Sequence, residues 1–188
     1  LGIAIHSKGV MLLSGYLGNR YAQGFALSFS ANIALEQSYG HIDGDSASLG
    51  EVCTLLSAIT QIPLNQGIAI TGSINQHGQV QSIGGVNEKI EGFFKLCEAR
   101  GLTGDQGVII PKTNKINLVL SEEVRSAVNA GTFHIYAVEE VDDALSLLTG
   151  KVAGKLSARG RYPRDSVNGI AAKRLQYIAD VVNQEFSD

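Results

Sequence analysis

The chain has 188 residues, of which 44% are hydrophobic, and its formal net charge is −3 at pH 7. A chain of this length and composition can bury one sizeable core, so we expect one main domain. The small negative charge argues against a general polyanion-binding protein, and we expect no nucleic-acid partner. No apolar stretch reaches the roughly 18 residues of a membrane-spanning helix and no signal peptide opens the chain, so we expect a cytoplasmic protein without membrane contact.

Helix and strand patterns alternate along the chain and predict an α/β fold. In the N-terminal part, residues 10–13 favour a strand, and residues 25–35 favour another, with a helix as the alternative there. Later elements are expected in this order: a helix from about 46, strands near 67–74 and 79–83, a helix at 86–100, a strand at 106–110, a helix at 122–130, a strand at 133–138, and helices at 141–148 and 167–186.

Ser46 lies in the segment DGDSAS, residues 43–48, where a glycine-containing turn meets a predicted helix. The helix is indicated by apolar residues at helical spacing: Leu49, Val52, Cys53, Leu56 and Ile59. Free backbone N–H groups and the positive end of the helix dipole favour an oxyanion at such a position, which suits a nucleophilic serine. The alternative is structural, because serine is also a preferred N-cap residue.

Lys89 lies on the second predicted helix, 86–100, at the border of its apolar face. Its nearest neighbours on the helix surface are Val86, Phe93 and Leu96, and we expect Phe93 and Leu96 to keep water from its amine. Burial would lower the pKa of this lysine, so that its neutral amine could take a proton from a serine hydroxyl. Alternatively, Lys89 lays its methylene groups on Phe93 and keeps its ammonium in water.

Three segments together carry a resemblance to a known family. GDSAS at 44–48, ITGS at 70–73 and GGVNEKI at 84–90 closely resemble the proteolytic domain of the Lon proteases, most of all the B-type and related bacterial Lon-like branch. The match runs from about residue 9 to residue 150. It implies the Lon proteolytic-domain fold of mixed strands and packed helices, and a catalytic Ser–Lys dyad of Ser46 and Lys89.

The resemblance also implies supporting residues. Thr71 would be a third member that orients the lysine amine, Asp43 would lie at the mouth of the site, and the backbone of Ser46 or Ala47 would stabilise the oxyanion. Without the family, Thr71 is an ordinary strand residue and Asp43 is a common turn residue. The chain departs from the more familiar Lon enzymes, which carry Thr-Gly-Glu where this chain has TGS, and a histidine-bearing strand where it has residues 30–35.

The expected function is that of a serine endopeptidase domain of an ATP-dependent Lon-like protease. The alternatives are a Ser–Lys amidohydrolase acting on small amides, and a catalytically silent structural or regulatory module. Protein or peptide substrates and a homo-oligomer, by resemblance a hexameric ring, are implied as partners. We expect no metal, because the histidines are scattered, and no cofactor in this chain, because it lacks a phosphate-binding loop. ATP would act only through an AAA+ module of the parent protein outside this chain.

The chain is expected to divide at residue 150. Residues 1–150 would form the Lon-type proteolytic domain, with its first strands missing because Ser46 comes so early. Residues 151–188 would form a basic linker and a C-terminal helix outside the protease core. This part contains seven basic residues against the single acid Asp165 up to residue 174: Lys151, Lys155, Arg159, Arg161, Arg164, Lys173 and Arg174. Their charges are interpreted as a solvated face, with docking onto a neighbouring subunit as the alternative.

Overall fold

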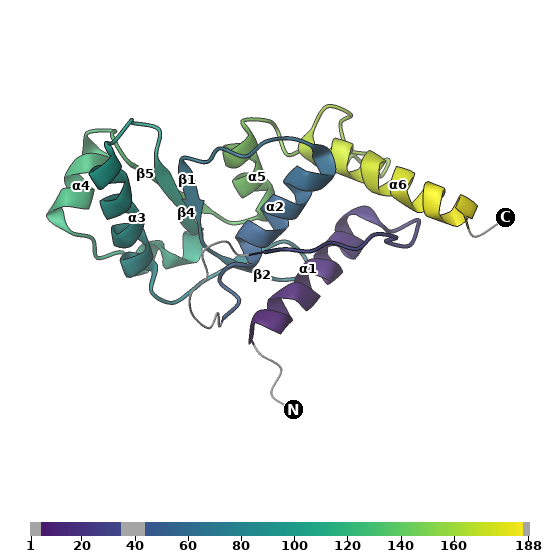
Figure 1. Ribbon diagram of the computed structural model, residues 1–188, viewed down its shortest axis with the longest axis horizontal. Helices are drawn as coiled ribbons and strands as arrows, with labels where there is room; N and C mark the ends of the chain where they lie inside the picture. The colour runs from purple at the N-terminus through teal and green to yellow at the C-terminus, as the bar shows by residue number, and fades with distance from the viewer. Residues whose placement is uncertain (1–4, 35–43, 186–188) are drawn as a thin grey trace.

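A computed structural model of the chain describes residues 5–34 and 44–185, and it has the α/β fold expected from the sequence (Figure 1). The described elements are, in chain order, α1 (Ile5–Tyr21), α2 (Ser48–Thr60), β1 (Ile68–Ile70), β2 (Ser73–Ile74), β3 (Val80–Gln81), α3 (Val86–Arg100), β4 (Gly107–Pro111), the 3₁₀ helix η1 (Lys112–Asn117), α4 (Glu122–Asn129), β5 (His134–Val138), α5 (Val141–Thr149) and α6 (Val167–Glu185).

A three-stranded parallel sheet lies at the centre, with β4 between β1 and β5. All five residues of β4 are buried, which fits a central strand covered on both faces. The expected strand 67–74 is divided, because β1 belongs to this sheet whereas β2 pairs with β3 in a separate antiparallel ribbon. Gly78, in the turn of that ribbon, has a φ of +82°, and a Cβ there would lie 2.6 Å from the ring of Tyr16.

Two hydrophobic clusters lie on either side of the sheet. The first contains buried residues of α1, α2, α5 and α6, together with Ile109 of β4. The second contains the apolar faces of α3 and α4, together with Val108 and Ile110 of β4. Successive side chains of a strand point to opposite faces, so β4 supplies one residue to the first cluster and its two neighbours to the second. Figure 1 shows α3 and α4 on one side of the sheet and α2, α5 and α6 on the other.

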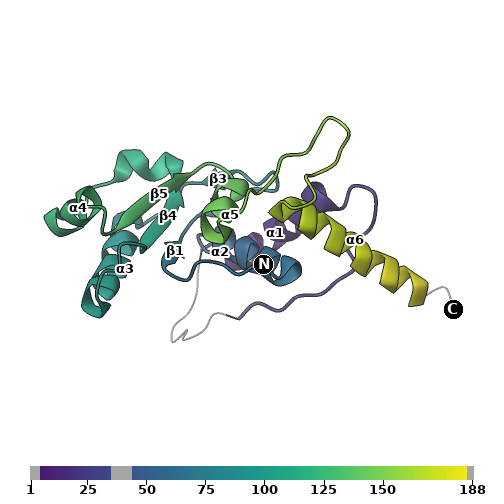
Figure 2. The same cartoon turned by 90° about the horizontal axis from the view of Figure 1, so that it is seen from above.

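The N-terminal part differs from expectation. Residues 10–13 were expected in a strand, but they lie within α1, because Leu13, Tyr16, Leu17 and Tyr21 face the first cluster at helical spacing. Residues 25–34 form no strand either. Phe25, Leu27 and Phe29 do pack against the first cluster, but the segment has no hydrogen-bonded partner strand among the described residues. Figure 2 shows this segment running beneath α6 in an extended course.

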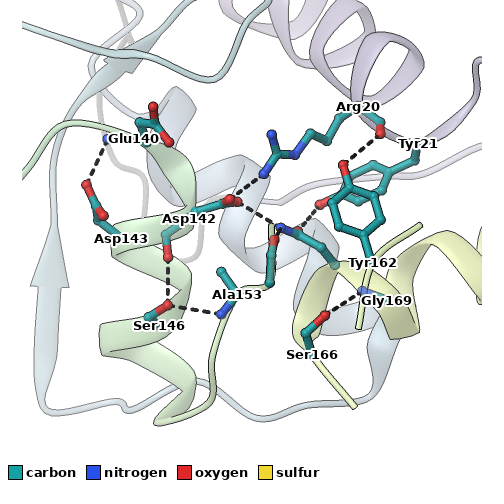
Figure 3. Close-up of polar contacts among 12 residues, drawn as sticks. Arg20, Tyr21, Glu140, Asp142, Asp143, Ser146, Ala153, Tyr162, Ser166 and Gly169 are labelled. Carbon is teal, nitrogen blue, oxygen red and sulfur yellow. Dashed lines mark hydrogen bonds and ion pairs between the residues drawn. The ribbon is translucent and has the colours of Figure 1, made fainter. Parts of the chain in front are cut away.

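The C-terminal helix α6 packs against α2 and α1, and its residues Val167, Ala171 and Leu175 belong to the first cluster. A polar network reinforces this contact (Figure 3). Arg20 forms an ion pair with Asp142, and the buried Asn168 donates to Asp142 Oδ1 at 3.0 Å and accepts from the hydroxyl of Tyr21 at 2.6 Å. The division of the chain at residue 150 stays a prediction. None of the described helices is both long and apolar enough to cross a membrane.

Candidate active site

Ser46 lies in a turn immediately before α2. The helix begins at Ser48 with Ala47 in the N-cap position, two residues later than expected, and no side chain caps it. The turn is closed by Ser48, whose amide and hydroxyl both donate to the carbonyl of Asp45, at 3.1 and 2.7 Å. Ser46 therefore does not cap the helix, and its hydroxyl is left for another contact.

The backbone of Ser46 is bound to the break between β1 and β2. The amide of Gly72 donates to the carbonyl of Ser46 at 2.8 Å, and the carbonyl of Gly72 accepts from the amide of Leu49 at 3.0 Å. A Cβ at position 72 would lie 2.9 Å from Leu49 Cδ2, so a larger residue would push against α2. This close approach holds the serine turn against the end of β1, where Thr71 lies.

Lys89 reaches this turn from the first turn of α3. Its Nζ lies 3.1 Å from Ser46 Oγ and 3.4 Å from Thr71 Oγ1, and it can donate to both. The Thr71 hydroxyl in turn donates to the carbonyl of Ser46 at 3.4 Å. Three residues that are far apart in the sequence thus form one small hydrogen-bonded group.

This group opens into a cavity of about 230 Å³. Its walls are formed by Ser46, Ala47, Ala69, Ile70, Thr71, Lys89 and Val108. Partial burial in these surroundings lowers the pKa of the Lys89 amine from its ordinary value of 10.5.

The cavity beside Lys89 is not lined by the two side chains that were expected to shield the amine. Phe93 turns toward Phe133, with ring centroids 6.3 Å apart, and Leu96 is 46% exposed. Neither residue lines the cavity, whereas Ala69 of β1 and Val108 of β4 do. The helical spacing around Lys89 could not identify these two residues. They belong to strands, and the contact of those strands with α3 is set by the fold.

The structure brings together Ser46, Lys89, Thr71 and Ala47 around one cavity, and the roles expected of them stay predictions. Asp43 lies outside the described residues, so its expected place at the mouth of the site stays a prediction. Within 5–34 and 44–185, no group of three or more histidine, cysteine or acidic side chains is arranged to hold a metal ion.

Comparison with known proteins identifies the family. The family described as Lon protease (S16) C-terminal proteolytic domain matches residues 28–150. A Lon protease homolog of Haemophilus influenzae is 48% identical over 182 residues, which cover 97% of this chain and 30% of that protein. One of Escherichia coli is 51% identical over 152 residues, covering 81% of this chain and 26% of that protein.

An archaeal Lon protease of Methanocaldococcus jannaschii is 45% identical over 92 residues, covering 49% of this chain and 13% of that protein. The chain thus spans less than a third of the length of each of these relatives. The family match covers more than half of the chain and includes the turn of Ser46, the end of β1 and the whole of α3. The chain therefore belongs to the Lon family of proteases and contains its C-terminal proteolytic domain.

Proposed function

We propose that this chain is a serine endopeptidase domain in which Ser46 is the nucleophile and Lys89 is the general base. The observation that carries the proposal is the distance of 3.1 Å between Lys89 Nζ and Ser46 Oγ. A serine hydroxyl needs a base within hydrogen-bond reach to become nucleophilic near neutral pH. An amine with a lowered pKa can supply that base, because a larger fraction of it is neutral.

The reaction would proceed in two halves. In the first, neutral Lys89 takes the proton of Ser46 Oγ as this oxygen attacks a peptide carbonyl, and the resulting ammonium then protonates the leaving amine. In the second, Lys89 takes a proton from water, whose oxygen attacks the acyl-enzyme ester, and returns the proton to Ser46 Oγ. Each half restores the charge of the lysine, so no further acid or base is needed.

Two features near Ser46 support this reaction. Among the described residues, the amides of Ser46 and Ala47 have no hydrogen-bond acceptor, so they are available to stabilise an oxyanion. The Thr71 hydroxyl can donate to the Ser46 carbonyl while it accepts from Lys89, which would hold the amine beside Ser46 Oγ. We assign Ala47 to the oxyanion site and Thr71 to the orientation of the base.

The remaining parts of the proposal concern the longer protein. Its relatives are more than three times the length of the region they share with this chain, which leaves room for other modules. We propose that an AAA+ module outside this chain supplies ATP-dependent unfolding, that the substrates are proteins or peptides, and that the domain works in a ring of copies. The proposed location is the cytoplasm.

The test is hydrolysis of casein and of a fluorogenic peptide by the longer protein and its Ser46→Ala variant. We expect the variant to be inactive and equally stable, with an unfolding free energy within about 0.5 kcal/mol of the wild type, because Ser46 caps no helix. Ser126→Ala, at an exposed serine on α4, is the matched control and should keep full activity.

Different results would favour the alternatives. Turnover of small amides without cleavage of casein or peptide would indicate an amidohydrolase. If the wild-type protein cleaves neither class of substrate under conditions in which it is folded and assembled, the domain is a silent module. Activity of Ser46→Ala equal to that of the wild type would contradict the assignment of the nucleophile.

A further inference from the structure

The helix that carries Lys89 is fastened at its beginning to one neighbouring segment. We call residues 112–121 the anchoring segment; it contains η1 and the four residues that precede α4. Asn114 of this segment is 3% exposed, and its side-chain amide pairs with the backbone of Ile83. Asn114 Nδ2 donates to the Ile83 carbonyl at 3.0 Å, and the Ile83 amide donates to Asn114 Oδ1 at 2.9 Å. Ile83 is thereby fixed three residues before α3 begins.

Asn87, in the first turn of α3, makes a second double contact with the anchoring segment. Its Nδ2 donates to the carbonyl of Asn117 at 3.0 Å, and its Oδ1 accepts from the amide of Val119 at 2.9 Å. Glu91 makes a third, because its two carboxylate oxygens accept from the amide and the hydroxyl of Ser121, at 2.7 and 3.0 Å.

The contacts of Asn87 and Glu91 lie on the side of α3 opposite to Lys89. Asn87 and Glu91 are four residues apart and share one face of the helix. Lys89 lies two residues from each of them, which is about 200° around the helix axis. The anchoring segment therefore holds α3 from one side while Lys89 extends from the other side toward Ser46.

Apolar packing alone would define the position of α3 less strictly than these hydrogen bonds do. Ile90 and Phe94 bury the inner face of α3 in the second cluster, and such contacts are non-directional. Hydrogen bonds of 2.7 to 3.0 Å have strict requirements for distance and angle, so they set the position of the helix along and around its axis. That position matters because Ser46 is fastened separately, to Gly72 and α2.

We propose that Asn114 and Asn87 are positioning residues for the Ser46–Lys89 pair, acting through the placement of α3 and touching neither substrate nor the reacting atoms. The inference rests on the proposed function, since it assumes that Lys89 is the base. Loss of either double contact would let α3 shift and carry the amine away from Ser46 Oγ and out of its cavity. A displacement of about 1 Å at a reacting group costs on the order of 100-fold in rate.

The experiment compares Asn114→Ala and Asn87→Ala in the longer protein, with peptide hydrolysis measured from pH 6 to 10.5. We expect kcat to fall about 10-fold to 100-fold in each variant, with KM changed by less than about 2-fold, because substrate contacts are untouched. The alkaline-rising limb of the pH–rate curve should move to higher pH, since an amine displaced into water regains its ordinary pKa. Asn87 is only half-buried, so its variant tests the proposal even if Asn114→Ala fails to fold.

Cys97→Ala is the matched control. Cys97 is buried in the same cluster on the same helix, but it lies at the far end from the anchoring segment. At equal loss of stability it should keep the kcat and pH–rate curve of the wild type. A second measurement does not depend on activity. The pKa of the Lys89 amine can be followed by NMR after reductive ¹³C-methylation, and it should rise in both asparagine variants and not in Cys97→Ala.

The outcomes separate the two proposals. If Ser46→Ala is as active as the wild type, the proposed function fails, and the NMR titration alone then decides whether the anchoring segment sets the environment of Lys89. If Ser46→Ala is inactive while the asparagine variants keep kcat, the pH–rate curve and the amine pKa of the wild type, the positioning role is overturned and the dyad stands. Equal effects in Cys97→Ala would also overturn it, because the cause would then be general loss of stability.

Discussion

The amine of Lys89 lies 3.1 Å from the hydroxyl of Ser46, although the helices beside these residues bury their apolar faces in different hydrophobic clusters. α2 belongs to the first cluster and α3 to the second, and the sheet lies between the two. The pair therefore forms only when both clusters and β4 are assembled. This dependence on the whole fold explains why contacts far from the reacting atoms are expected to affect the site.

The pH dependence of the peptidase rate should report on Lys89. Its pKa is lowered by partial burial, so the rate is expected to rise with pH through an apparent pKa below the ordinary value of 10.5. Lys89→Arg should be inactive, because a guanidinium stays protonated throughout this range. A rate profile of the purified longer protein from pH 6 to 10.5 checks both statements, and an active arginine variant would exclude Lys89 as the base.

The same lowered pKa should appear in stability. Between the folded-state pKa and the ordinary value of 10.5, the unfolded chain binds more protons at Lys89 than the folded chain does. The free energy of unfolding of the wild type, relative to Lys89→Met, should therefore rise as the pH increases through this window and become constant above it. Denaturant midpoints of both proteins from pH 7 to 11 measure the difference. A difference that falls with pH would mean that the folded state favours the charged amine.

Removal of the Thr71 hydroxyl should slow the reaction without a large change in packing. Thr71→Val keeps the shape of a buried side chain but loses the contacts with Lys89 Nζ and the Ser46 carbonyl. We expect kcat to fall about 10-fold or more, because the amine is less well oriented. The pH–rate curve should move to lower pH, since a hydrogen-bond acceptor for the charged amine is lost. Thr71→Ser retains the hydroxyl and is the control; if it behaves like Thr71→Val, the hydroxyl is not the cause.

The strands, more than the outer face of α3, should control the surroundings of Lys89. Val108 lines the cavity and is 2% exposed, so Val108→Ala should cost about 2–3 kcal/mol and raise the amine pKa by admitting water. Phe93→Ala removes a comparable apolar contact, with Phe133, and should leave the pH–rate curve unchanged. The pH–rate curves of the two variants test this prediction. A shift of the curve in Phe93→Ala and not in Val108→Ala would contradict the role given to the strands.

Gly72 should be needed for the close approach of the serine turn to the sheet. In Gly72→Ala the new methyl group would lie 2.9 Å from Leu49 Cδ2 and 3.1 Å from Val80 Cγ1, so we expect a loss of about 1–3 kcal/mol and a lower kcat. Gly92→Ala on α3 is the matched control. Its Cβ would meet nothing within 4 Å, so it should stabilise the helix by about 0.5–1 kcal/mol at unchanged activity. Thermal denaturation and peptide hydrolysis of the two variants measure this difference. Equal stabilities of Gly72→Ala and Gly92→Ala would contradict the prediction.

Local patterns predicted much of the fold where helical spacing was regular. Residues 86–100 form the helix expected from their apolar stripe, and 141–149 end at Gly150, which has the left-handed conformation expected of a residue after a helix. The N-terminal part was misread because residues 10–13 form a continuous apolar run, and such a run does not distinguish a strand from a buried helix. Phe25, Leu27 and Phe29 of the alternating segment do pack against the first cluster, but a strand also needs a partner strand, which the sequence alone does not reveal.

The candidate site also contains residues that the sequence identified and residues that only the structure shows. Ser46, Lys89 and Thr71 were found because their motifs resemble a known family, and the structure brings their side chains together. The roles of Val108 and Asn114 were not visible in the sequence. Both depend on contacts between segments about 20 to 60 residues apart, so only the folded chain shows them.

Covalent labelling reports whether Ser46 is a nucleophile that Lys89 activates. The longer protein is incubated with a fluorophosphonate at pH 8.5, and its intact mass is measured with time, alongside Ser46→Ala and Lys89→Met. We expect one adduct per chain in the wild type, located on the peptide that contains Ser46, and none in Ser46→Ala. Labelling should be slowed about 100-fold or more in Lys89→Met, as expected when a general base is removed. Labelling of Ser46→Ala at the wild-type rate, or of Lys89→Met as fast as the wild type, would contradict these expectations.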